Sequence, residues 1–130
     1  MLYLDSSAIV KLVAPEPESA ALVERLRSDP ETVSSALAGV EVLRAVRRAG
    51  SAAEKVSRAQ AVLDRIALVP IDTGVLRRAS RMESTDLRTL EAIHLATALM
   101  LGPEIAGLVT YDARLAQAAT SAGLAALAPS

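Results

Sequence analysis

The sequence contains no cysteine, phenylalanine or tryptophan, and its aromatic residues are two tyrosines, Tyr3 and Tyr111. Without cysteine there are no disulfides, no thiolate metal ligands and no cysteine nucleophile, and a reducing cytoplasm is compatible with the composition. Because large rings are scarce, the core has to be built from leucine, valine, isoleucine and alanine. The chain has 130 residues, a length that predicts one domain over residues 1–130.

Long apolar runs and an excess of positive charge are also missing. The longest mostly apolar stretch, AIHLATALML at 92–101, is too short to span a bilayer, and MLYLD at the start is not a signal peptide. Fourteen basic and 15 acidic residues give a net charge of −1. This balance argues against nucleic-acid binding by bulk positive charge, while a local basic rim or a metal-mediated contact with phosphate stays open.

Short apolar runs alternate with amphipathic stretches along the chain. Strands are predicted at 1–5, 31–35, 67–72, 106–112 and 124–127. Helices are predicted at 6–14, 18–27, 36–50, 51–66, 73–82, 87–101 and 113–123, with Ser6 or Ser7 as N-cap of the first. This alternation predicts an α/β fold with a mostly parallel sheet and helices on both faces.

Two acids follow predicted strands: Asp5 after LYL and Asp112 after LVTY. In a parallel sheet, binding sites lie beyond the carboxyl ends of the strands, so the two carboxylates are candidates for one site. The simpler interpretation is that each is an N-cap for the following helix. Both interpretations stay open, and Thr110 is placed to orient the Asp112 carboxylate.

Two further acids, Glu41 and Glu91, lie in apolar helical surroundings. Glu41 is either a site residue or an exposed residue paired with Arg44 three positions on. Glu91 is either a metal ligand or a first-turn acid that complements the helix dipole. A helix as apolar as 87–101 is expected to be buried, and a buried lone carboxylate is costly unless it is paired or binds metal.

The only histidine, His94, lies three residues after Glu91. A single imidazole does not make a zinc site, and a set of carboxylates favours Mg²⁺ or Mn²⁺. We therefore predict that His94 forms hydrogen bonds inside the fold. A glycine-rich phosphate loop and a nucleophile-elbow serine are both absent from the sequence.

Four motifs in order, LYLDSSAIVKL, a helix bearing Glu41, LRTLEAIHLATAL and LVTYDARLAQAA, resemble the PIN-domain ribonucleases, specifically the VapC-type toxins of bacterial toxin–antitoxin pairs. The resemblance spans the whole chain and implies a PIN-like three-layer fold. The family's acidic quartet, which is both catalytic and metal-binding, carries over onto Asp5, Glu41, Glu91 and Asp112. The sequence departs from the family pattern at Glu91, where the usual residue is aspartate.

The resemblance also implies a chemistry and its partners. Four crowded carboxylates repel and raise one another's pKa values, and one or two Mg²⁺ or Mn²⁺ ions relieve this and activate a water for endonucleolytic cleavage of RNA. A homodimer and a cognate antitoxin, bound in the groove between the early helices, are implied partners. Ser6 and Thr110 are expected to orient the metal ligands. The candidate phosphate-binding residues are Arg44, Arg48 and Arg88, with Lys11 a weaker one.

Two other hypotheses remain. The first is a PIN fold without useful catalysis that acts as a protein-binding module, which the departure at Glu91 favours. The second is an unrelated flavodoxin-like regulatory domain whose acids bind one Mg²⁺. That domain would have a lysine after a late strand, where LVTYDAR has an acid instead.

Overall fold

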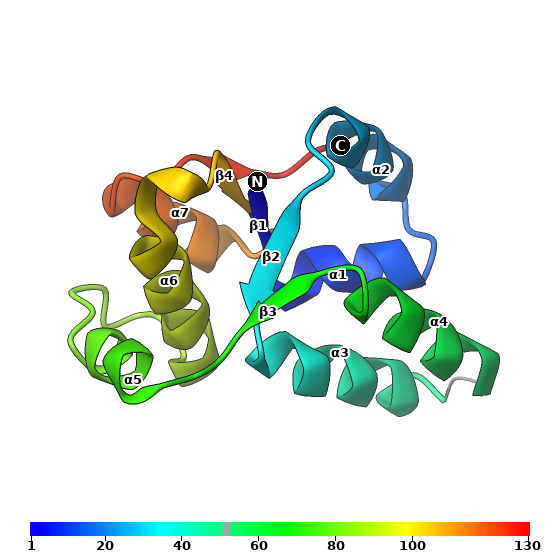
Figure 1. Cartoon of the computed structure of the whole chain (residues 1–130), viewed down its shortest axis with the longest axis horizontal. Helices are drawn as coiled ribbons and strands as arrows, with labels where there is room; N and C mark the ends of the chain where they lie inside the picture. The colour runs from blue at the N-terminus through cyan, green and yellow to red at the C-terminus, as the bar shows by residue number, and fades with distance from the viewer. Residues whose placement is uncertain (51–52) are drawn as a thin grey trace.

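Five parallel strands form the centre of the computed structural model, which describes residues 1–50 and 53–130. Their order in the sheet is β3-β2-β1-β4-β5, so the first strand of the chain lies in the middle (Figure 1). The strands are β1 Leu2–Leu4, β2 Thr32–Ser35, β3 Ala67–Val69, β4 Gly107–Val109 and β5 Ala126–Leu127. The predicted parallel sheet is thereby confirmed.

Helices cover both faces of this sheet, which gives three layers (Figure 1). The helices are α1 Ser6–Val13, α2 Ser19–Ser28, α3 Leu37–Arg48, α4 Ala53–Leu63, α5 Thr73–Ser80, α6 Thr89–Leu101 and α7 Ala113–Ser121. One layer contains α1, α3 and α4, with α2 packed against α1, the other contains α6 and α7, and α5 packs against α6. In the described residues no helix has both the length and the apolar character needed to cross a membrane.

The central strand β1 contributes to both layers because successive side chains of a strand point to opposite faces. Leu2 and Leu4 belong to the core cluster under α1, α3 and α4, whereas Tyr3 belongs to the cluster under α6 and α7. In the register with β4, Leu4 is the partner of Val109. The two strands therefore end at the same level, and the residues that follow them start from one edge of the sheet.

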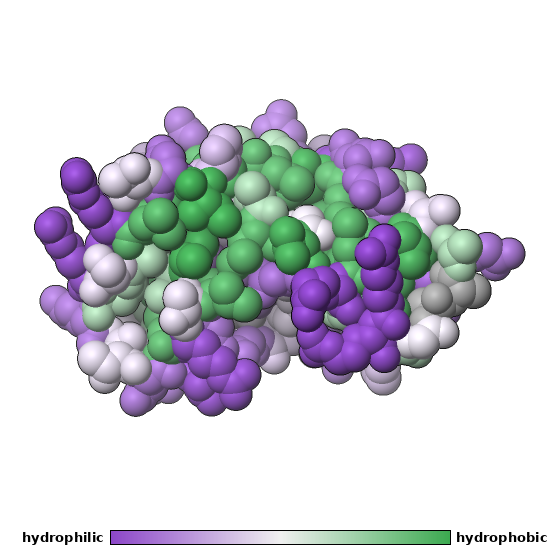
Figure 2. All heavy atoms as spheres, turned by 90° about the horizontal axis from the view of Figure 1, so that it is seen from below, coloured by the Kyte–Doolittle hydropathy of each residue, from purple (hydrophilic) through white to green (hydrophobic). Residues whose placement is uncertain are grey.

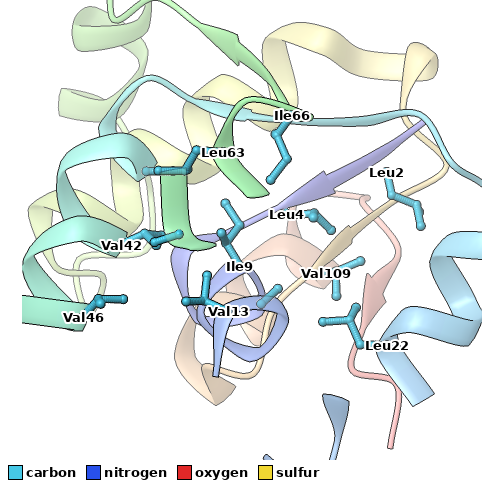
Figure 3. Close-up of a cluster of buried hydrophobic side chains, with 13 residues drawn as sticks. Leu2, Leu4, Ile9, Val13, Leu22, Val42, Val46, Leu63, Ile66 and Val109 are labelled. Atoms are coloured by element: carbon cyan, nitrogen blue, oxygen red, sulfur yellow. The ribbon is translucent and has the colours of Figure 1, made fainter. Parts of the chain in front are cut away.

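The larger core cluster is aliphatic, as the composition predicts (Figure 3). Ile9 and Val13 from α1 pack with Val42 from α3 and Leu63 from α4, and all four side chains are almost fully buried. Burying a side chain of this size stabilises the fold by about 1.5–3 kcal/mol. This packing fixes α1 and α3 side by side at the edge where the candidate site lies.

Some predicted boundaries differ from the structure for identifiable reasons. The N-cap of α1 is Asp5 and neither Ser6 nor Ser7, because an Asp5 oxygen accepts the Ala8 amide while the Ser7 hydroxyl donates to the same oxygen. Strand β3 ends at Val69, earlier than the predicted 72, because Pro70 has no N–H for the ladder. Of the predicted helix 51–66, residues 51 and 52 lie outside the described residues.

Glycines mark two of the predicted helix ends. Gly50 has a φ of 71° just after α3, and Gly102 has a φ of 54° at the end of α6. A positive φ of this size favours glycine, which lacks the Cβ that would clash. A short 3₁₀ turn, Gly102–Glu104, then leads into β4.

Candidate active site

Asp5 is the most deeply buried of the four candidate acids, with 4% of its surface exposed. Its Oδ1 accepts hydrogen bonds from Ser7 Oγ at 2.6 Å and from the Ala8 amide at 3.0 Å, and its Oδ2 accepts one from Thr110 Oγ1 at 2.5 Å. Burial raises the pKa of Asp5, and the hydrogen bonds from Ser7, Thr110 and Ala8 oppose the rise without cancelling it. None of these three donors carries a charge.

Thr110 connects Asp5 to the segment that carries Asp112. The Thr110 hydroxyl donates to Asp5 and accepts the Asp112 amide at 3.1 Å. The Asp112 carboxylate is instead the N-cap of α7, where Oδ1 accepts the amides of Arg114 at 2.9 Å and Leu115 at 3.0 Å. The prediction that Thr110 orients the Asp112 carboxylate is wrong: it orients Asp5 and the backbone of Asp112.

Glu41 projects from the first half of α3, and 22% of its side chain is exposed. Its Oε1 accepts hydrogen bonds from Ser6 Oγ at 2.5 Å and from His94 Nε2 at 2.6 Å. The interpretation of Glu41 as an exposed partner of Arg44 is therefore wrong. Burial alone raises the pKa of Glu41, but the hydrogen bonds from His94 and Ser6 outweigh it and hold the pKa below its usual range.

Glu91 lies in the first turn of α6 and is partly exposed. Its Oε2 accepts the backbone N–H of Arg88 at 2.9 Å, which satisfies one of the free amides at the start of the helix. The helix-start interpretation thus describes the contact that Glu91 makes in this structure. The ligand interpretation requires the other oxygen, Oε1.

The four candidate acids lie around the carboxyl edge of the sheet, but they do not close into one cluster. Asp5 and Asp112 are linked through Thr110, and Glu41 is linked to α6 through His94, one helical turn after Glu91. Within residues 1–50 and 53–130, no three histidine or acidic side chains are grouped closely enough to hold a metal ion. The quartet remains a prediction.

The chemistry of these donors nevertheless fits a hard divalent cation. Carboxylate oxygens are the ligands that Mg²⁺ and Mn²⁺ prefer. Glu41, Glu91 and Asp112 each use a single oxygen in the hydrogen bonds they make to the described residues. A helix cap and a metal ligand are therefore compatible roles for the same carboxylate.

A hollow of about 690 Å³ opens beside Glu41 between α1 and α3. Ser6 and Ser7 line it together with Glu41, and basic side chains surround it: Lys11, Arg44 and Arg48. Lys11 already binds Glu16 at 2.6 Å and Glu18 at 3.0 Å. Arg88 is not part of the lining, so the structure brings Arg44 and Arg48 to the hollow but not Arg88.

Sequence reasoning correctly predicted hydrogen bonds of His94 inside the fold but missed its partners. The ring joins Tyr3 on β1 to Glu41 on α3. Ser7 was missed as well, although its place two residues after a strand-end aspartate is a local signal for a bond to that carboxylate.

A comparison of the sequence with protein-family profiles matches the PIN domain over residues 2–121. The chain belongs to the PIN-domain family. It is 51% identical to the ribonuclease VapC46 of Mycobacterium tuberculosis over 130 residues, covering 99% of this chain and 98% of that protein. It is 34% identical to the ribonuclease VapC47 of the same species over 133 residues, with 99% and 97% covered.

Solved structures share the fold of this PIN domain at low sequence identity. FitAcB from Neisseria gonorrhoeae superposes with a TM-score of 0.76 at 20% identity, with 99% of this chain and 98% of that chain covered. A toxin–antitoxin complex from Klebsiella pneumoniae gives a TM-score of 0.75 at 17% identity, with 100% and 98% covered. The three-layer PIN-like fold is confirmed, and the unrelated flavodoxin-like domain is excluded.

Proposed function

We propose that this PIN domain is a VapC-type toxin, a Mg²⁺- or Mn²⁺-dependent endoribonuclease that hydrolyses RNA phosphodiester bonds and is neutralised by a cognate antitoxin. One domain over residues 1–130 carries the activity. The observation that supports it best is a buried aspartate, Asp5, which is hydrogen-bonded to Ser7 in the wall of a hollow that also contains Glu41 and basic side chains. The residues proposed to be catalytic and to hold the metal are Asp5, Glu41, Glu91 and Asp112.

Asp5 itself supports a cation requirement. A buried ionised carboxylate is costly when only neutral groups surround it. All three hydrogen bonds to Asp5 come from neutral donors, two hydroxyls and one amide. A divalent ion at this carboxylate supplies the missing positive charge.

The remaining residues of the site hold and orient its carboxylates. When bound, the metal supplies a lowered pKa for an attacking water and stabilisation of negative charge on the phosphate. Thr110 and Ser7 fix the two oxygens of Asp5, and Ser6 fixes one oxygen of Glu41. Hydrolysis by water needs no covalent nucleophile from the protein, which agrees with the absence of cysteine from the sequence.

The purified chain is expected to cleave single-stranded RNA with Mg²⁺ or Mn²⁺ and to stop when EDTA is added. Cleavage returns when excess Mn²⁺ is restored, and gel electrophoresis of end-labelled RNA measures all three states. The Asp5→Asn protein, purified in the same way, controls for contaminating ribonuclease. Cleavage that persists in EDTA contradicts the metal requirement, and intact RNA under every metal condition favours the non-catalytic binding module.

Arg44 and Arg48 are proposed to hold RNA phosphates at the rim of the hollow. Both are exposed residues of α3, and each lies in the lining that also contains Glu41. Bound phosphates release counterions from the RNA, so each such contact makes the affinity depend on salt.

Arg48→Gln is expected to weaken RNA binding and to lower the slope of log affinity against log salt by about one. The neighbouring Arg47→Gln is the matched control, because Arg47 is exposed on the same helix but lines a different hollow, next to α4. Fluorescence anisotropy with labelled RNA in several salt concentrations measures both slopes. Equal slopes for the two variants contradict the phosphate role of Arg48.

A homodimer, an antitoxin and a cytoplasmic location are proposed on the family resemblance. Exposed apolar side chains of α3, α5 and α6, among them Val40, Leu76 and Leu90, are available for such contacts. Figure 2 shows apolar residues gathered over the face seen from below, next to hydrophilic groups. The mass of the purified chain, alone and with the product of the neighbouring gene, tests both partners.

A further inference from the structure

A line of buried polar groups runs from the central strand to Glu41. The Tyr3 hydroxyl lies 2.7 Å from His94 Nδ1, and His94 Nε2 lies 2.6 Å from Glu41 Oε1. Tyr3 is fully buried and His94 is 3% exposed. The two rings meet edge to face, with centroids 5.9 Å apart and planes at 80°.

The donors and acceptors along this line follow from the chemistry of the groups. The ionised Glu41 carboxylate only accepts, so His94 Nε2 carries the proton between them. A neutral ring protonated at Nε2 has an acceptor at Nδ1, and the Tyr3 hydroxyl donates to it. The ordinary pKa of a tyrosine hydroxyl is about 10, so at neutral pH Tyr3 has a proton to donate.

This line joins Glu41 to the strand that bears Asp5. Tyr3 lies on β1 two residues before Asp5, in the middle of the sheet, whereas Glu41 lies on α3 in another layer. A glutamate side chain has three rotatable bonds and does not by itself keep one position. Ser6 and His94 both bind Oε1 and thereby fix the rotamer, while neither binds Oε2.

We propose that His94 is a positioning residue for Glu41. The Tyr3 hydroxyl holds the His94 ring in the tautomer with a proton on Nε2, and this N–H keeps the Glu41 carboxylate in one position relative to Asp5. The inference rests on the proposed nuclease function for its kinetic consequence. Its geometric content, the tautomer and the bond to Glu41, does not depend on catalysis. Histidine acts here through Glu41 and does not touch the RNA.

The tautomer is tested without any activity measurement, because His94 is the only histidine in the sequence. A two-dimensional ¹H–¹⁵N spectrum of the ring is expected to show a proton on Nε2. The ring signals are expected to move in Glu41→Ala, which removes the acceptor. A proton found on Nδ1 alone, or ring signals unchanged in Glu41→Ala, overturns the proposal.

Kinetics test the positioning role. His94→Leu, which removes the donor, is expected to lower kcat for RNA cleavage by tenfold to about a hundredfold with little change in KM, since small displacements of a catalytic group cost about this much. His94→Gln retains an N–H donor and is expected to recover most of the loss. Tyr3→Phe keeps His94 but removes the hydroxyl that holds the His94 ring in one tautomer. It is expected to lower kcat less than His94→Leu.

Leu95→Val is the control for disturbance of the core, because Leu95 is buried on the same helix and belongs to the cluster under α6 and α7. It is expected to lower the melting temperature and to keep kcat. A wild-type kcat in His94→Leu, or a His94→Gln protein no faster than His94→Leu, overturns the positioning role. If the His94→Leu protein does not fold, the kcat values of His94→Gln and Tyr3→Phe and the spectrum of the His94 ring test the proposal instead. A wild-type chain that never cleaves RNA defeats the proposed function, while the spectrum still decides the tautomer.

Discussion

Replacing Asp5 with asparagine is expected to abolish RNA cleavage and to leave the metal-free protein at least as stable as the wild type. Asparagine is as good an N-cap as aspartate, and its oxygen can accept the same bonds from Ser7 and Ala8. Its amide can donate to the Thr110 hydroxyl oxygen, which reverses the direction of the wild-type bond from Thr110 to Asp5. The substitution thus removes the charge and keeps the local structure.

The stability of these two proteins is expected to depend on pH in a defined direction. Burial raises the pKa of Asp5 in the folded state above its unfolded value, which is about 3.9. An acid with a raised folded pKa favours folding below the unfolded pKa, and this contribution is lost as pH rises through the folded value. Asp5→Asn has no such loss, so its advantage in melting temperature is expected to grow from pH 4 to neutral pH, about 7.

Mn²⁺ is expected to reverse the order of stability of the wild type and Asp5→Asn. A ligand that binds only the folded state stabilises it by mass action, so Mn²⁺ is expected to raise the melting temperature of the wild type but not of Asp5→Asn. Asp72→Asn is the matched control, since Asp72 caps α5 in the same way, by accepting the Val75 amide at 2.9 Å. Asp72 is not one of the four proposed metal ligands, and among the described residues its side chain binds only the start of its own helix, so Asp72→Asn is expected to keep cleavage. A severe loss of stability in Asp5→Asn without metal means that Asp5 is a structural cap.

The position of Asp5 and Asp112 at one edge could be predicted because it depends on local pattern alone. A short apolar run followed by an acid defines a buried strand and its end, and parallel strands bring such ends to the same edge. The pairing of β1 with β4 in register satisfies this rule. The prediction needed no knowledge of which helix packs where.

The partners of Glu41 could not be predicted in the same way. The bond between Glu41 and His94 joins residues 53 positions apart, and it exists because α3 and α6 approach each other beyond the edge of the sheet. Hydrophobic periodicity indicates that both helices are buried, but it does not specify which polar groups meet. From the sequence, the only partner that could be named for Glu41 was Arg44, the nearest basic residue along the helix.

The expected cause of the raised pKa values was also wrong in part. Mutual repulsion predicted raised values for all four acids, yet burial causes the rise at Asp5, and the pKa of Glu41 is lowered. The reason is that each carboxylate has its own protein donors and the side chains do not form one cluster. The carboxylates that the sequence alone suggested were crowded are instead bound separately to helix-start amides, hydroxyl groups and His94.

The second large effect is expected at Glu91, the position at which the family resemblance implies an aspartate. Glu91→Ala is expected to remove cleavage by deleting a metal ligand, and to cost about 1 kcal/mol of stability because the Arg88 amide loses its acceptor. Loss of activity alone does not separate a ligand from a cap. Glu91→Gln does, since glutamine accepts the same amide but carries no charge.

Glu91→Gln is therefore expected to melt like the wild type and to cleave RNA no faster than Glu91→Ala. Glu91→Asp is expected to retain or raise activity, because aspartate keeps the charge and both oxygens and shortens the side chain by one methylene. Mg²⁺ requires nearly ideal octahedral geometry, and a displaced ligand can cost about a hundredfold in rate. Rates on one RNA at matched Mg²⁺ and Mn²⁺ concentrations, with melting curves of the same four proteins, measure both roles.

Glu54→Gln is the matched control for charge at a helix start, since Glu54 is an exposed acid in the first turn of α4. It is expected to leave cleavage unchanged. If Glu91→Gln cleaves as fast as the wild type while Glu91→Ala melts earlier, Glu91 is a capping residue, and the metal is held by fewer acids than the family pattern implies. If Glu91→Gln is inactive with an unchanged melting curve, one oxygen caps α6 while the charge of the carboxylate serves the metal, and the two interpretations of this residue are both correct.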